Sequence, residues 1–156
     1  MSKLENTPFS NPKGLHIGLV VKDLDKAKEY YTSLGIGPFR SYRLQVTEKE
    51  MFGKPVAPGQ SKVRSANAKW GPVDLSLFQL VEGPNVSREF LEKYGEGINH
   101  IDILVDDLDG DMKKLIKKGL KVITSGKYAG GGGWAYFDTR EVGNVILCLE
   151  QLPPEY

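Results

Sequence analysis

Hydrophobic and polar positions alternate along this chain in an order that occurs twice. Two segments rich in Ile, Leu and Val, residues 15–21 and 100–105, have the composition of buried strands. Each is followed by apolar residues at helical spacing, over 23–35 and again over 107–119. An acidic residue precedes each helical pattern and a glycine ends it, as is typical of capped helices. Each half of the chain is therefore predicted to begin with a strand and a helix.

After each helix the pattern returns to that of strands. We expect strands at 39–46, 62–70 and 73–81 in the first half, and at 121–125, 134–138 and 144–151 in the second. The segment 47–60 shows no regular period, and a loop of that length often forms a lid or rim of a site. Residues 83–97 have the pattern of a short linker helix that ends at Gly95.

The two halves are related by an ungapped repeat at an offset of 84 residues. His16-Ile17 aligns with His100-Ile101, and Asp23-Leu24-Asp25 aligns with Asp107-Leu108-Asp109. Each half reads as a βαβββ unit, and neither could bury a sheet face alone. We therefore expect an α+β fold in which two tandem βαβββ modules form one cupped mixed β-sheet with flanking helices. The predicted parts are an N-terminal tail (1–13), a first module (14–82), a linker helix (83–97) and a second module (98–152), with one domain overall (14–151).

Composition narrows the classes of function. A formal net charge of +1 gives no broad field for nucleic acid or for a membrane surface. No apolar run is long enough to span a bilayer, and the N-terminal segment lacks the apolar core of a secretory signal. Cys148 is the one cysteine in the sequence, which excludes an intrachain disulfide. We expect a cytoplasmic protein whose partner is a small molecule.

The two histidines of the chain stand at equivalent points of the repeat. Because side chains alternate along a strand, His16 shares a face with Gly18, and His100 shares a face with Asp102. A pseudo-twofold arrangement of the modules would bring both histidines to one concavity. Neutral imidazole is the commonest metal ligand, so this placement indicates half of a metal site. The plainer interpretation, that each histidine is a packed core or rim residue, does not account for their equivalence.

Further ligands are expected from the last strand of each module. Gln79 is a polar residue in an apolar strand and can supply a carbonyl oxygen to a metal. Cys148 and Glu150 share a face of the final strand, and either could be the fourth ligand. Each also has a plainer interpretation: Gln79 as an edge residue, Cys148 as a small buried hydrophobe, and Glu150 as a solvated strand end.

Aromatic and basic residues are candidates for contact with a ligand. Four glycines before Trp134 could let a loop close over a bound molecule, or they form a plain flexible hairpin. The candidate substrate-binding residues are Trp134, Tyr136, Phe78 and Arg64, which could equally be core or surface residues.

These segments resemble the vicinal oxygen chelate superfamily, the glyoxalase, bleomycin resistance and dioxygenase group. The resemblance is closest to the branch of glyoxalase-like proteins that includes methylmalonyl-CoA epimerase. It is carried by "LHIGLVVKDLDKAKEYYTSLGI", "NHIDILVDDLDGDMKKLIKKGL", "LFQLVEG" and "AYFDTREVGNVILCLEQ". It implies paired modules around a divalent metal whose ligands come from the first and fourth strands of each module. His16, Gln79 and His100 fall on three of these positions, and the family pattern places Cys148, not Glu150, at the fourth.

The resemblance implies a divalent metal such as Zn, Mn, Co, Ni or Fe, and we expect a homodimer. The expected activity is that of a metal-dependent isomerase, epimerase or lyase acting on a small carbonyl or carboxylate compound, with acyl-CoA esters included. Proton abstraction needs a base beside the Lewis acid, and the candidate catalytic residues are Glu150, Cys148 and Glu48, with Asp102 as a further base. The alternative is a non-catalytic protein of the bleomycin-resistance type that binds and sequesters a small molecule.

Overall fold

The computed structural model describes residues 6–41 and 43–156. Part of the predicted N-terminal tail, residues 1–5, lies outside the described residues. The elements in chain order are β1 (Leu15–Val21), α1 (Leu24–Ser33), β2 (Val46–Met51), β3 (Lys54–Pro55), β4 (Lys62–Trp70), β5 (Val73–Glu82), α2 (Ser87–Tyr94), β6 (Gly97–Leu104), α3 (Leu108–Lys117), β7 (Val122–Tyr128), β8 (Gly133–Phe137) and β9 (Ile146–Gln151).

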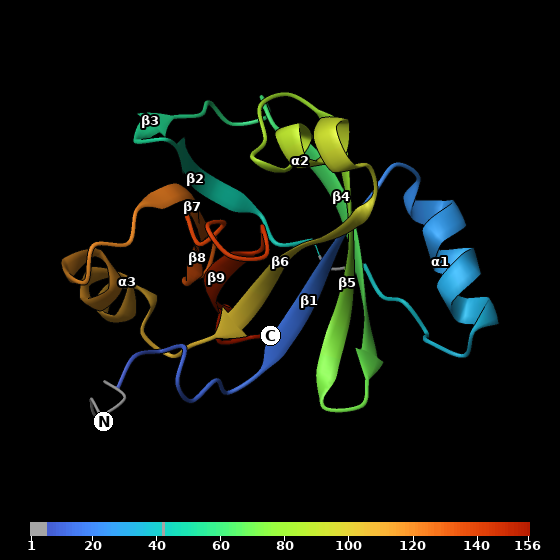
Figure 1. The fold of residues 1–156 in the computed structure, drawn as a ribbon, viewed down its shortest axis with the longest axis horizontal. Coiled ribbons are helices and arrows are strands. Elements are labelled where there is room, and N and C mark those ends of the chain that lie inside the picture. Colours follow the sequence, from blue (N-terminus) through green and yellow to red (C-terminus); the bar gives the residue numbers. More distant parts are fainter. Residues whose placement is uncertain (1–5, 42) are drawn as a thin grey trace.

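The nine strands form one mixed sheet in the order β3-β2-β7-β8-β9-β6-β1-β5-β4. The first strands of the two halves, β1 and β6, are antiparallel neighbours in the middle of the sheet. Each also pairs in parallel with the last strand of its own half, β1 with β5 and β6 with β9. Figure 1 shows α1 on the side of β4 and β5, and α3 on the side of β8 and β9. The expected α+β fold with a curled mixed sheet is confirmed.

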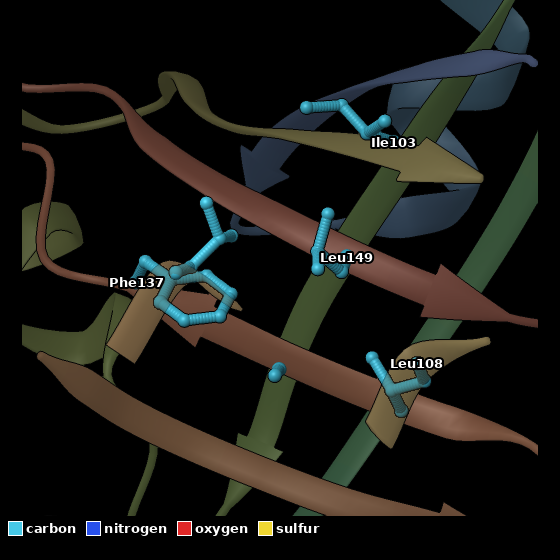
Figure 2. Close-up of a cluster of buried hydrophobic side chains, with 6 residues drawn as sticks. Ile103, Leu108, Phe137 and Leu149 are labelled. Carbon is cyan, nitrogen blue, oxygen red and sulfur yellow. The ribbon is translucent and has the colours of Figure 1, made fainter. Parts of the chain in front are cut away.

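The helices cover the apolar outer face of the sheet. Between α3 and the sheet, the buried residues Ile103, Leu108, Phe137 and Leu149 belong to one cluster (Figure 2). A second cluster under α1 contains Val21, Leu24, Ala66, Leu75 and Leu77. Alternate residues of a strand point to opposite faces of the sheet. Odd-numbered residues of β1, β5, β6, β8 and β9 fill these clusters, so the even-numbered residues of the same strands point to the inner face. The polar histidines and carboxylates therefore lie inside the curve of the sheet.

Both long helices begin in the same way. Asp23 accepts hydrogen bonds from the backbone N–H groups of Asp25 and Lys26 and so caps α1. Asp107 caps α3 by accepting from the N–H of Gly110. None of the helices in the described part of the chain is long and apolar enough to cross a membrane.

The predicted strand 39–46 is wrong. Among the described residues of this segment before Val46, an isolated bridge between Arg40 and Asn67 is the one β-type pairing. Tyr42, also in the predicted strand, lies outside the described residues. Arg40 bridges to β4, whereas the backbone carbonyl of Gln45 accepts a hydrogen bond from the N–H of Ala129 in the second half, so the two ends of the segment bind to different halves.

The segment 47–60, predicted to be irregular, instead contains the hairpin of β2 and β3. The turn residues Phe52 and Gly53 have φ values of 51° and 72°, the conformation of tight hairpin turns. β2 pairs with β7, so this hairpin of the first half joins the sheet of the second half. The pattern concealed the strand because residues 48–50 are all charged, so neither face shows apolar alternation.

Candidate metal centre in the cup

The inner face of β1 and β6 places the repeated histidines diagonally across the two strands. In the antiparallel register His16 lies opposite Asp102, and Gly18 lies opposite His100. A Cβ atom on Gly18 would stand 2.1 Å from Nε2 of His100, so the imidazole of His100 occupies the space above Gly18. The repeat aligns Gly18 with Asp102. Glycine at position 18 leaves room for the His100 ring, whereas aspartate at the equivalent position 102 places a carboxylate opposite His16.

Three side chains converge near the middle of the cup. Candidate ligand atoms of His16, Asp102 and Glu150 all lie within 4.8 Å of one another. Nδ1 of His16 is 3.6 Å from Oε2 of Glu150. Nε2 of His100 is 3.4 Å from Oδ2 of Asp102. Asp102 therefore belongs to the three-residue cluster and is also close to His100, which lies outside the cluster.

Outer groups fix the orientation of both rings. Nε2 of His16 is 3.3 Å from Oδ2 of Asp74. Nδ1 of His100 is 3.1 Å from Oδ1 of Asn99, and the same oxygen accepts a hydrogen bond from the Ser87 hydroxyl at 2.9 Å. Histidines that bind metals usually direct the second ring nitrogen to a carboxylate or carbonyl, which orients the first. In this arrangement Nδ1 of His16 and Nε2 of His100 face the acidic groups of the cup.

The pKa values of Glu150 and Asp102 are shifted in opposite directions. Burial and the nearby negative charge of Asp102 raise the pKa of Glu150 to about 7, although the Tyr128 hydroxyl donates a hydrogen bond to it at 2.7 Å. Burial also disfavours the charged form of Asp102, but the charges of His100 and His16 outweigh it and hold the pKa of Asp102 below its usual value. The cluster can thus hold one carboxylate and one carboxyl group that titrates near neutral pH.

The donor set fits a divalent cation. No lysine or arginine of the described residues forms an ion pair with Asp102 or Glu150, so a bound cation would supply the missing positive charge. One imidazole nitrogen and two carboxylate oxygens suit Zn, Mn, Co, Ni or Fe. His16, Asp102 and Glu150 would hold such an ion, with His100 beside Asp102.

Cys148 contacts the cluster through Asp102 but is not one of its three members. It is fully buried in a small core with Ile123 and Ile146, and it stands opposite Asp102 in the pairing of β6 with β9. Burial and the charge of Asp102 raise the pKa of the Cys148 thiol well above its usual value, which disfavours the thiolate that binds metals. Of the two residues left open for the fourth position, the structure brings Glu150 to the cluster.

Gln79 does not lie beside the histidines as expected. Its neighbour Phe78 lines the cup, so Gln79 points to the opposite face of β5. There its Oε1 accepts hydrogen bonds from the backbone N–H of Leu24 at 3.2 Å and from Arg64 at 3.3 Å. Gln151 does the same in the second half, accepting from Leu108 at 3.0 Å. Gln79 therefore links the start of α1 to β5, as Gln151 links the start of α3 to β9, and its side chain does not point to the histidines.

We predict that Gln79→Leu lowers the free energy of unfolding by about 1 kcal/mol and leaves metal affinity unchanged, since the hydrogen bonds from the start of α1 and from Arg64 are lost. Urea unfolding and a metal titration measure the two effects. Gln151→Leu is the matched variant and should behave alike. Loss of metal binding in Gln79→Leu alone would restore Gln79 as a ligand.

The candidate substrate-binding residues surround a cavity of about 1320 Å³. The rings of Phe78 and Tyr136 contact His100, with centroid distances of 6.0 and 5.2 Å. Trp134 packs against Tyr128 with a centroid distance of 5.3 Å. Arg64 borders the cavity, but its guanidinium lies on the outer face of β4, where it binds Asp25 and Gln79. All four candidates therefore contribute to one cavity that also contains His16, His100, Asp102 and Glu150.

Glu48, the remaining candidate base, lies at the rim. Its carboxylate is exposed and pairs with Lys127 at 3.5 Å, apart from the cluster. Two contributors were missed by the sequence analysis: Asp74, which faces His16, and Tyr128, which donates to Glu150. Asp102 was considered only as a base. Its position two residues after His100 on the same strand face was the signal for a ligand role.

Comparison with known proteins identifies the superfamily to which this fold belongs. The sequence model of the Glyoxalase/Bleomycin resistance protein/Dioxygenase superfamily matches residues 15–137, and the chain belongs to this superfamily.

Three known proteins are similar to this chain, one in sequence and two in structure. The uncharacterized protein YqjC of Bacillus subtilis (strain 168) is 27% identical over 137 residues, which cover 86% of this chain and 88% of that protein. The methylmalonyl-CoA epimerase of Mycobacterium tuberculosis superimposes with a TM-score of 0.71 at 22% identity, over 99% of this chain and 95% of the other. A variant of the Streptomyces coelicolor methylmalonyl-CoA epimerase in complex with 2-nitronate-propionyl-CoA gives a TM-score of 0.56 at 25% identity, over 87% and 91% of the two chains.

Proposed function

We propose that the protein is a divalent-metal-dependent isomerase of the epimerase type, acting on a small carbonyl or carboxylate compound, with acyl-CoA esters as the leading substrate class. The observation that carries the proposal is the convergence of His16, Asp102 and Glu150 on the floor of the cup, with their candidate ligand atoms within 4.8 Å of one another. The epimerase neighbour that holds an acyl-CoA analogue supports the substrate class.

Different residues would bind the cation and orient the group that transfers the proton. A divalent cation, when bound, would supply the positive charge that stabilises negative charge on a substrate oxygen. His16 and Asp102 would hold it, with Asp74 orienting the His16 ring. Glu150 completes the cluster, and its carboxylate would accept the proton from the substrate carbon and return it. The Tyr128 hydroxyl holds one oxygen of Glu150 and leaves the other toward His16.

The proposal predicts exchange of a substrate proton with solvent. Metal-loaded protein incubated in D₂O with 2-methyl-branched acyl-CoA esters and 2-oxo acids should introduce deuterium next to the carbonyl, measured by mass spectrometry. Glu150→Gln should lower the exchange rate by about 100-fold or more.

Glu48→Gln is the matched control, because it removes an exposed carboxylate of the same cavity rim, and it should keep the full rate. Exchange that is equally fast in Glu150→Gln would remove Glu150 from the reaction. Absence of exchange with every compound in the metal-loaded protein would contradict the proposed activity.

A second function, sequestration of an aromatic ligand, is favoured by the size of the cavity. At about 1320 Å³ it exceeds the usual range of small-molecule sites, and Trp134, Tyr128, Tyr136 and Phe78 line it. A sequestering protein would bind aromatic compounds tightly without metal and with both histidines replaced.

A homodimer, expected from the sequence, stays a prediction.

A further inference from the structure

One row of cup-facing residues runs across four strands from the metal cluster to the β2–β3 hairpin. Glu150 on β9 lies opposite Trp134 on β8, and Trp134 lies opposite Gly126 on β7. Gly126 in turn lies opposite Lys49 on β2. Directly opposed residues in antiparallel strands point to the same face, so Lys49 is directed to the same side of the sheet as Glu150.

The middle of this row is flat and aromatic. A Cβ atom on Gly126 would stand 2.0 Å from the Trp134 ring, so the indole covers the backbone of Gly126. Tyr128, two residues further along β7, packs against the same indole. Between the carboxyl group of Glu150 and the ammonium group of Lys49 the cup therefore presents an apolar platform.

Lys49 is a half-buried cation whose hydrogen-bond partner is a neutral hydroxyl group. Its Nζ donates a hydrogen bond to the Ser61 hydroxyl at 2.8 Å, and both residues line the cavity. None of the carboxylates that the structure describes forms an ion pair with it, whereas the adjacent Glu48 pairs with Lys127. Burial lowers the pKa of Lys49, and no neighbouring negative charge opposes this effect. An ammonium group partly removed from water and unpaired is stabilised by an anion that enters the cavity.

We propose that Lys49 and Ser61 form a binding site for an anionic oxygen group, a carboxylate or a phosphate, at the end of the ligand opposite the metal cluster. Four adjacent strands place Lys49 and Glu150 about 14 Å apart along the sheet at their backbones, and both side chains extend into the cup. The site thus fits an elongated ligand with an apolar middle on Trp134 and an anionic far end. The inference rests on the proposed function in treating the cup as the substrate site.

The test uses metal-free protein, so that its result does not depend on metal or on turnover. The probes are phenyl phosphate, phenylacetate and neutral benzyl alcohol, and binding is followed by Trp134 fluorescence in a Trp70→Phe background. Lys49→Met should weaken binding of the anionic probes by about tenfold and leave benzyl alcohol unchanged. Lys49→Arg should retain most of the affinity, and Lys54→Met, an exposed lysine of the same hairpin outside the cavity, should behave as the parent protein. The ratio of the affinities for phenyl phosphate and phenylacetate tells a phosphate site from a carboxylate site.

Equal affinity of Lys49→Met and the parent protein for both anionic probes would overturn the proposal, as would an equal loss for benzyl alcohol, which would indicate a structural role only. Thermal unfolding of each variant verifies that the hairpin remains folded. Failure of the proposed activity would appear separately, as absent proton exchange in the metal-loaded protein with anion binding intact.

Discussion

Replacing His16 with alanine is expected to lower the affinity of the protein for Zn²⁺ or Mn²⁺ by at least about 100-fold. His16 supplies the imidazole of the three-residue cluster, and loss of a ligand costs more than loss of an outer group that orients one. Asp102→Asn should have a similar effect, because it removes a negative charge that stands close to both histidines. The affinities are measured by calorimetric titration of protein freed of metal with a chelator.

The control for this pair is again Glu48→Gln, which changes the net charge of the chain as Asp102→Asn does but lies at the exposed rim. Its metal affinity should equal that of the parent protein. Unchanged affinity in both His16→Ala and Asp102→Asn would mean that the metal binds elsewhere or not at all.

The second large effect is expected from the smallest substitution, Gly18→Ala. The added Cβ atom would meet Nε2, Cε1 and Cδ2 of His100 at 2.1 to 2.4 Å. The ring cannot move aside easily, since it is 2% exposed and lies between Phe78 and Tyr136. We expect a loss of about 1–3 kcal/mol in the free energy of unfolding, as for other overpacked core positions, together with weaker metal binding.

Gly97→Ala is the matched control on the neighbouring strand, because the nearest atom to its added Cβ is 3.6 Å away on Phe90. Urea unfolding of Gly18→Ala, His100→Ala and the double variant tests the cause. If the clash with His100 is responsible, Gly18→Ala costs much less in the absence of the imidazole ring. An equal cost in both backgrounds would show that the clash with His100 is not the cause.

The fold could be predicted because its main signals are local. The strands β1 and β6, the helices α1 and α3 and their equivalence under an 84-residue offset follow from apolar spacing and capping residues. The β2–β3 hairpin could not be predicted in this way. Its strand is charged on both faces, and its pairing with β7 is a tertiary contact that no local pattern records.

The candidate site was predicted in part. The equivalence of His16 and His100 led to the cup, where both line one cavity. Gln79 was misplaced because a polar residue in an apolar strand indicates a need for a partner but not which face it points to. The partner is the N–H at the start of α1, and the matching Gln151 of the second half was the overlooked signal. The position of Asp102 opposite His16 depends on the register of β1 against β6, which alternation alone does not fix.

The central claim, a cation held by His16, Asp102 and Glu150, is tested most directly by a crystal structure of Mn²⁺- or Zn²⁺-loaded protein with anomalous scattering recorded at the metal edge. The account predicts one strong anomalous peak in the cup, about 2.0–2.2 Å from a ring nitrogen of His16 and from carboxylate oxygens of Asp102 and Glu150. A peak bound by Gln79 or by the sulfur of Cys148, or a cup without a peak at saturating metal, would contradict it.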